Sequence, residues 1–287
     1  MTVDWIGLYN DALDYIEQNL DNEISCEEAA KRAGCSAYHF QRMFPYVAGV
    51  PLSEYLRRRR LTRAALDLQN GDKVMDVAVR YGYDSPTAFN RAFRKLHGVS
   101  PSAAQRPDTS LKAYPRISFR LILKGEAEME YRIVKKDAFR IVGVRDKIVM
   151  DAEVNFERVP IFWQETAEKG LIPAIASLVN GEPAGILGVS SCFPEDEDNW
   201  YYIAAVTDKP VPDGMREFTI PACTWAVFPG QGEMPGAIQE LERRIVAEWL
   251  PTSGYEWAEA PDIEVYLEPT PDNAKYEVWL PIKKTAG

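Results

Sequence analysis

Two predicted strands of this chain carry acidic residues beside aromatic ones. Asp262, Glu264 and Tyr266 alternate along one strand and share a face, as do Glu277 and Trp279 on the next. A buried carboxylate without a partner is costly. The same carboxylate among aromatic rings attracts a flat cation through charge pairing and cation–π contacts. The pattern predicts a site for a small amphipathic molecule, aromatic or cationic. A buried Glu264 with a raised pKa would also suit general acid or base catalysis.

Two further sets of residues have the chemistry of DNA contacts. They lie on two predicted helices: Tyr38, His39, Gln41 and Arg42 on one, and Thr87, Asn90, Arg91, Arg94 and Lys95 on the other. Short amides and arginines on an exposed helix face can bind base edges and phosphates in the major groove. The alternative, two solvated helices in an ordinary bundle, predicts charges of both signs. Residues 36–49 and 85–98 contain no acidic residue, which favours DNA contacts.

The two helices belong to a pattern that is written twice, 49 positions apart. The first copy has Ser36, Phe40, Arg42, Phe44 and Gly49, and the second has Ser85, Phe89, Arg91, Phe93 and Gly98. Each serine can cap a helix, and each pair of phenylalanines, four positions apart, forms an inward apolar stripe. A small-residue turn precedes each serine. The sequence therefore predicts a helix, a tight turn and a helix, used twice.

Residues 6–106 resemble the tandem helix-turn-helix domain of AraC-type transcription regulators. The resemblance rests on residues 30–44, on Val77-Ala78 and Gly82-Tyr83, and on residues 98–101. It implies two recognition helices in successive major grooves, joined by a long helix over about residues 52–68. It also implies base contacts, from Tyr38, Gln41 and Arg42 in the first helix and from Thr87, Asn90 and Arg91 in the second. The expected partners are double-stranded promoter DNA and RNA polymerase.

The distribution of charge supports this interpretation better than the total does. The chain has a net charge of −10, which alone would repel DNA. Residues 36–106, however, hold 12 Lys and Arg against 5 Asp and Glu, whereas residues 108–287 hold 19 against 30. The positive part includes the run Arg57-Arg58-Arg59-Arg60. Because four consecutive residues point all round a helix, at most two of these arginines can face one phosphate strand.

After Pro107 the pattern changes to alternating strands. Strands are predicted at 117–123, 129–134, 139–144, 186–192, 200–206, 224–228, 263–267 and 276–280, and helices at 154–168 and 235–249. The order of strand, helix, strand, strand occurs twice. It predicts two pseudo-symmetric halves that form one antiparallel sheet with helices on one face, and a groove between the halves suits a ligand. Six of the seven tryptophans lie in this part: Trp163, Trp200, Trp225, Trp249, Trp257 and Trp279.

Residues 128–281 are similar to the GyrI-like effector-binding domains. The similarity rests on residues 129–134, 141–144, 263–267 and 276–282. It implies that Glu264 lies at the floor of a ligand groove lined by Tyr266, Glu277 and Trp279, with Trp225 and Trp163 as further walls. It also leaves open a hydrolase, since some stand-alone relatives hydrolyse reactive small molecules. In the alternative, Glu264 and Glu277 face solvent at an open sheet edge.

The predicted fold is thus multidomain. An all-α tandem helix-turn-helix domain (1–107) is followed by a linker (108–126) and an α+β effector-binding domain (127–287). The leading hypothesis is a transcription regulator, not an enzyme, that senses a small molecule, for which a lipophilic cation is expected. The alternatives are hydrolysis of a reactive small molecule by the second domain, and a constitutive DNA-binding protein whose second domain contacts other proteins.

Cysteines, histidines and apolar runs exclude several other classes of protein. Cys26, Cys35, Cys192 and Cys223 are scattered without C-x-x-C spacing, and His39 and His97 are the only histidines. Neither a metal site nor a cofactor is expected, and the four cysteines are expected to be reduced, buried thiols. No apolar run approaches the roughly 18 to 20 residues that span a bilayer, and the N-terminus has no leader pattern. A cytoplasmic protein without membrane contact is expected.

Overall fold

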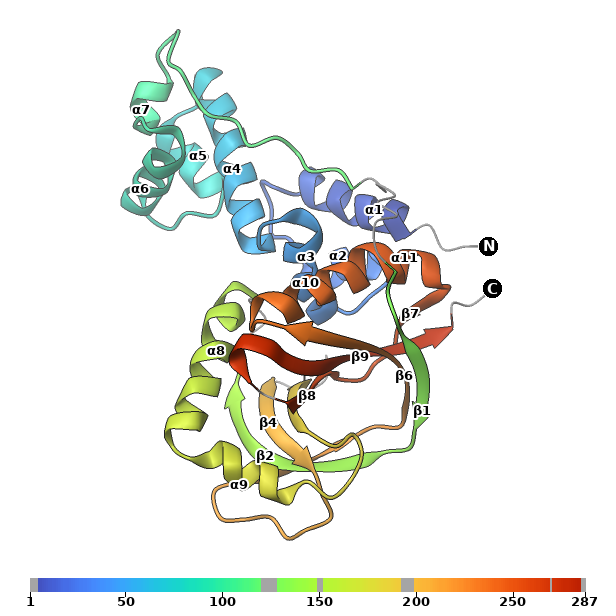
Figure 1. The fold of residues 1–287 in the computed structure, drawn as a ribbon. Coiled ribbons are helices and arrows are strands. Elements are labelled where there is room, and N and C mark those ends of the chain that lie inside the picture. The colour runs from blue at the N-terminus through green and yellow to red at the C-terminus, as the bar shows by residue number, and fades with distance from the viewer. Residues whose placement is uncertain (1–4, 120–127, 149–151, 192–198, 269, 285–287) are drawn as a thin grey trace.

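The computed structural model describes residues 5–119, 128–148, 152–191, 199–268 and 270–284 (Figure 1). Its N-terminal part is helical: α1 Trp5–Gln18, α2 Cys26–Arg32, α3 Ala37–Ala48, α4 Leu52–Gln69, α5 Val74–Arg80, α6 Pro86–His97 and α7 Pro101–Ala104. Helices α2 and α3 form the first repeat, and α5 and α6 form the second. Helix α4 joins them. None of the helices in these ranges is long and apolar enough to cross a membrane.

Local signals place α3 and α6 in the same way. The side chain of Ser36 accepts a hydrogen bond from the backbone N–H of His39, and that of Ser85 accepts one from Ala88. Each helix then ends at a glycine in the left-handed region, with φ of 72° at Gly49 and 81° at Gly98. The two predicted helix-turn-helix units are therefore confirmed.

The C-terminal part is built on one antiparallel sheet. Its strands are β1 Arg132–Lys136, β2 Phe139–Lys147, β3 Ile186–Ser191, β4 Trp200–Val206, β5 Arg216–Ile220, β6 Cys223–Gly232, β7 Tyr255–Trp257, β8 Asp262–Glu268 and β9 Ala274–Lys284. The order is β1-β6-β9-β8-β3-β4-β2-β5, and β7 also pairs with β9. The central strands β6-β9-β8 and β3-β4-β2 mirror each other, as the predicted double βαββ arrangement requires. The two halves meet where β3 pairs with β8.

Helices cover one face of this sheet. They are α8 Ala152–Glu168, α9 Leu171–Leu178 and α10 Gly236–Arg244, which continues into a π-helical turn, Ile245–Trp249, and α11 Leu250–Ser253; a short 3-10 turn, Pro271–Asn273, precedes β9. The residues Ile203, Gly188, Glu264 and Val278 are cross-strand partners in one row, so all lie on this helix-covered face. This confirms the α+β class, and it puts Glu264 at the centre of the covered face.

Five details differ from the predicted elements. The edge strand β5, the three-residue β7 and the short helix α9 were not predicted, because short segments carry little periodicity and form here by pairing or packing. Residues 117–119 are not a strand, and residues 120–123 lie outside the described ranges. The predicted helix at 235–249 contains the π-helical turn.

The two repeats differ in what they pack against. Phe40 and Phe44 of α3 share one hydrophobic core with Phe228, Ile245 and other residues of the C-terminal part. Phe89 and Phe93 of α6 belong instead to a separate core with residues of α4 and α5. In Figure 1, α3 accordingly lies next to α10, while α5, α6 and α7 lie at the far end of the molecule.

Candidate ligand-binding site

A cavity of about 690 Å³ opens between α8 and α10, above the strands where the two halves of the sheet meet. Three residues of α3 complete its wall. The lining residues are Gln41, Arg42, Tyr46, Ile148, Asn155, Val159, Pro160, Trp163, Gln164, Ser190, Tyr201, Met234, Pro235, Ile238, Gln239, Glu242, Glu264, Tyr266 and Ala274. The cavity is thus shared by the C-terminal part and the first repeat.

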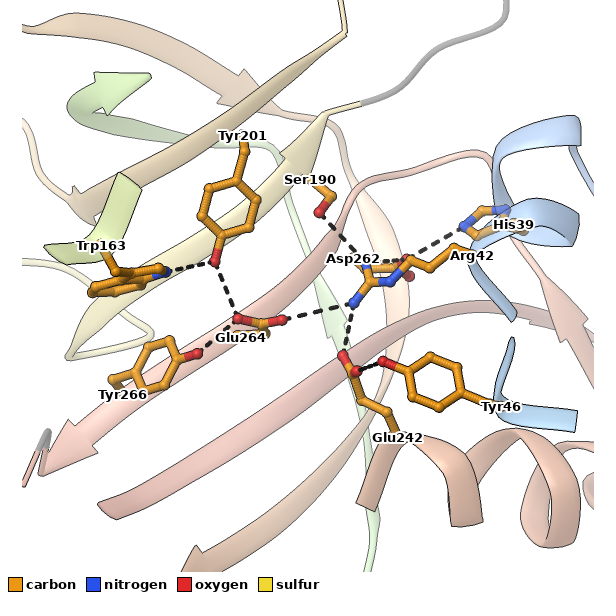
Figure 2. Close-up of polar contacts among 10 residues, drawn as sticks. All are labelled: His39, Arg42, Tyr46, Trp163, Ser190, Tyr201, Glu242, Asp262, Glu264 and Tyr266. Atoms are coloured by element: carbon orange, nitrogen blue, oxygen red, sulfur yellow. Dashed lines mark hydrogen bonds and ion pairs between the residues drawn. The ribbon is translucent and has the colours of Figure 1, made fainter. Parts of the chain in front are cut away.

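Glu264 lies among aromatic hydroxyl groups in this cavity (Figure 2). Tyr266 and Tyr201 both donate to its Oε2 atom, at 2.8 and 3.2 Å. The indole Nε1 of Trp163 donates in turn to the hydroxyl of Tyr201, at 3.0 Å. Gly188 makes room for this arrangement, since a Cβ atom there would lie 2.2 Å from the Tyr201 hydroxyl and 2.9 Å from Glu264 Oε2.

Arg42 reaches from α3 into a group of three acidic residues, Glu242, Asp262 and Glu264, here called the carboxylate cluster. Its guanidinium nitrogens lie 2.7 Å from Glu242, 3.0 Å from Asp262 and 3.7 Å from Glu264. The side chain of Arg42 is only 15% exposed. Tyr46, one turn further along α3, donates to Glu242. Figure 2 shows Arg42 between the three carboxylates.

The carboxylate cluster carries more negative charge than Arg42 can balance. Burial and, next to it, the charge of Glu242 raise the pKa of Glu264 to about 7, although Arg42 opposes the rise. Burial also disfavours the charged form of Asp262, but Arg42 and His39 outweigh it and lower the pKa of that carboxyl. Among the lining residues that the structure describes, Arg42 is the only basic side chain.

His39 takes part in the same contact between α3 and the C-terminal part, although it was predicted to lie on the exposed face of its helix. Its ring stacks on Trp257, with 5.0 Å between centroids, and its Nε2 atom lies 3.7 Å from Asp262. The hydroxyl of Ser36 is 2.8 Å from the other ring nitrogen, so the residue that caps α3 also holds this ring. The polar face of α3 is therefore turned toward the C-terminal part.

The predicted ligand residues fall on both faces of the sheet. Glu264, Tyr266 and Trp163 come together in the cavity. Glu277 and Trp279 alternate with Val278, the cross-strand partner of Glu264, so they point to the opposite face. Trp279 is buried there with Trp225, and Glu277 pairs with Arg132 at 2.8 Å. These three predicted wall residues do not line the cavity.

The predicted DNA contacts are divided in a similar way. On α6, Thr87, Arg91, Arg94 and Lys95 are exposed and Asn90 is half-buried. On α3, Gln41 and Arg42 line the cavity, and the side chain of Tyr38 lies outside the described part.

The run of four arginines on α4 is largely engaged within the protein. Arg57 and Arg58 pair with Glu54 of the same helix. Arg59 pairs with Glu17 of α1 at 2.6 Å and is only 11% exposed. Arg60 donates to two backbone carbonyls that follow α1. Arg59 and Arg60 therefore connect α4 to α1 and the residues after it, whereas Arg57 and Arg58 pair within α4.

Several site residues were not predicted from the sequence: Tyr46, Tyr201 and Glu242 as lining residues, and Arg42 as the partner of Glu242. Glu242 had a readable signal, because it lies four positions after Ile238 and three before Ile245, on the apolar stripe of its helix. A carboxylate on a buried stripe needs a cationic partner. Its partner is 200 positions away in the chain, so only the fold identifies it.

Comparison with known proteins agrees with both parts of the fold. Residues 129–283, more than half of the chain, match the GyrI-like small molecule binding domain, and residues 29–107 match a helix-turn-helix domain. The HTH-type transcriptional activator AarP of Providencia stuartii is 39% identical over 104 residues, which are 36% of this chain and 77% of AarP.

A second relative extends over both parts. The transcriptional regulator Rob of Salmonella typhimurium is 26% identical over 303 residues, covering 98% of this chain and all of Rob. Among solved structures, SAV2435 bound to tetraphenylphosphonium is 24% identical, covers 54% of this chain and 94% of its own, and has a TM-score of 0.48. Both of these relatives in sequence are transcription regulators, and the matched C-terminal family is a small molecule binding domain. The chain therefore belongs to the GyrI-like family of small-molecule binding domains, joined here to an AraC-type helix-turn-helix domain as a transcription regulator.

Proposed function

We propose that this regulator responds to a lipophilic cation that binds in the cavity between α8 and α10. The observation that carries the proposal is the buried Glu264, held by Tyr201 and Tyr266 beside Trp163. The cavity, at about 690 Å³, is of the size that takes drug-sized ligands. Aromatic faces together with a carboxylate favour a flat or delocalised cation over a neutral molecule.

The surplus of negative charge supports the same ligand class. Three carboxylates gather around Arg42, and two of them, Glu242 and Glu264, line the cavity. A second cation in the cavity would stabilise the ionised form of Glu264, whose pKa of about 7 keeps it partly protonated at neutral pH. A neutral ligand of the same shape gains nothing from this charge.

For DNA, the proposed contact surface is α6. Thr87, Arg91, Arg94 and Lys95 are exposed on one helix without an acidic residue between positions 85 and 98. Such a face can enter a major groove and donate to bases and phosphates. Contact with RNA polymerase stays a prediction.

The test is isothermal titration calorimetry of the full chain with tetraphenylphosphonium and with neutral triphenylphosphine oxide. Glu264→Gln keeps the shape of the side chain but removes its charge. We expect this substitution to weaken binding of the cation by about 30-fold, or about 2 kcal/mol, and to weaken binding of the neutral compound far less. The matched control is Glu277→Gln, because Glu277 lies on the opposite sheet face and should leave both affinities unchanged.

Two results would contradict the proposal. Equal losses for the charged and the neutral compound would assign Glu264 a structural role. No saturable binding of the cation by the wild-type chain would favour the alternative in which the second domain contacts another protein.

A further inference from the structure

A cationic side chain of the protein itself, Arg42, already lies where a cationic ligand is proposed to bind. Arg42 lies 2.7 Å from Glu242 and 3.7 Å from Glu264, the carboxylates that line the cavity, and 3.0 Å from Asp262 behind them. This guanidinium is also aligned by Ser190, at 3.4 Å. It is therefore fixed at the edge of the space that the ligand would enter.

Arg42 is at the same time a residue expected to contact DNA, through the first recognition helix. In the present arrangement that helix cannot enter a major groove by its polar face. Gln41 and Arg42 line the cavity, His39 is buried against Trp257, and α3 packs against α10 and the π-helical turn. Binding of α3 to DNA requires that it first leave the C-terminal part.

Departure of Arg42 alone would leave three carboxylates without their principal cation. Leaving buried charge uncompensated is strongly unfavourable, so the carboxylate cluster holds α3 in place. A cation that enters the cavity beside Glu242 and Glu264 supplies the missing charge. The ligand and Arg42 thus compete for the same oxygens, and the ligand makes the release of α3 less costly.

We propose that Arg42 is an internal occupant of the cation site, and that a cationic ligand displaces it and frees α3 to bind DNA. The inference rests on the proposed ligand class. It makes the two recognition helices unequal, since α6 is exposed in the present arrangement and α3 is not. Without ligand, one helix reads DNA; with ligand, both do.

The test is selection of DNA sites by the full chain from a library of random 30-base-pair duplexes, with and without tetraphenylphosphonium. Without the cation, the enriched sites should contain one block of specified bases. With the cation, they should contain two blocks about one helical turn, or about 10 base pairs, apart. Affinity for the two-block site should rise by about 5- to 150-fold on adding the cation, the usual range for coupled sites, and the DNA should raise cation affinity by the same factor.

Two variants test the contact without any ligand. Asp262→Asn and Glu242→Gln each remove one charge that holds Arg42 and change no residue expected to contact DNA. Both substitutions should raise the affinity of the protein for the two-block site and speed amide hydrogen exchange in α3. Circular dichroism is the control that each variant is folded. Arg42→Ala should remove the block read by α3 from the sites selected with the cation, and should leave the block read by α6 unchanged.

The outcomes separate this inference from the proposed function. If the cation binds but neither α3 exchange nor the selected site changes, the inference is overturned and the ligand site stands. If the cation does not bind, the proposed function fails. The contact of Arg42 is then judged by Asp262→Asn and Glu242→Gln, and unchanged DNA affinity and exchange in both would overturn it.

Discussion

The two recognition helices carry the same local signals but lie in different surroundings. Both begin at a capping serine, bury two phenylalanines and end at a left-handed glycine. Helix α6 shares a core with α4, α5 and, just after the helices, Leu111, and it exposes Arg91. Helix α3 shares a core with the C-terminal part and buries the equivalent Arg42 among carboxylates.

An arginine on a helix face therefore does not by itself indicate which group it will bind. A guanidinium binds a carboxylate and a phosphate with the same donors and geometry. An acid-free polar face is therefore suited both to DNA and to an acidic protein surface. In α3, Arg42 lies on the face that was predicted to contact DNA, and it pairs instead with Glu242 and Asp262 of the C-terminal part.

The largest expected difference between the helices is in stability. Arg42→Ala leaves Glu242, Asp262 and Glu264 without their principal cation, and should destabilise the docked arrangement by about 3 to 5 kcal/mol. Arg91→Ala, at an exposed position, should change stability by about 0.5 kcal/mol or less. Urea unfolding followed by tryptophan fluorescence measures both. Similar small changes in the two variants would mean that Arg42 is not energetically tied to the carboxylate cluster.

A smaller effect is expected in DNA binding without ligand. Arg91→Ala should weaken specific binding by about 1 to 3 kcal/mol, the usual value of one base contact. Arg42→Ala should cause no loss under the same conditions, because Arg42 is engaged elsewhere. Fluorescence anisotropy with a selected duplex at fixed salt measures both affinities. Equal losses would show that α3 already reads DNA in the ligand-free protein.

The smallest expected effect is a pH dependence of cation affinity, which arises in the carboxylate cluster beside α3 and has no counterpart at α6. Glu264 faces Arg42 and Tyr46 of α3, Glu242 of α10, Tyr201 of β4, and Asp262 and Tyr266 of its own strand. Its pKa of about 7 means that the carboxylate, the form proposed to bind the cation, becomes populated as the pH rises through that value.

Affinity for tetraphenylphosphonium should therefore rise by about tenfold, or about 1.4 kcal/mol, from pH 6 to pH 8 and then level off. Calorimetry across this range measures it. Glu264→Gln should abolish the slope, and an unchanged slope in that variant would assign the titration to another group.

Much of the local structure could be predicted because it depends on short-range patterns. The serine caps, the phenylalanine pairs and the alternation that puts Asp262, Glu264 and Tyr266 on one strand face all follow from spacing. Spacing also put Glu277 and Trp279 on one face. It could not say that this face is opposite to that of Glu264, because only the cross-strand pairing of Glu264 with Val278 decides it.

Patterns in the amino-acid sequence are sufficient for the two helix-turn-helix units, the doubled arrangement of the sheet and the acidic-aromatic strand at its centre. These features follow from capping, periodicity and strand alternation, each of which acts over a few residues. Only the tertiary structure decided that Arg42 meets Glu242, Asp262 and Glu264, residues 200 to 222 positions away. Such a contact depends on how two folded parts dock, and the residues next to Arg42 in the sequence do not indicate which carboxylates it will contact.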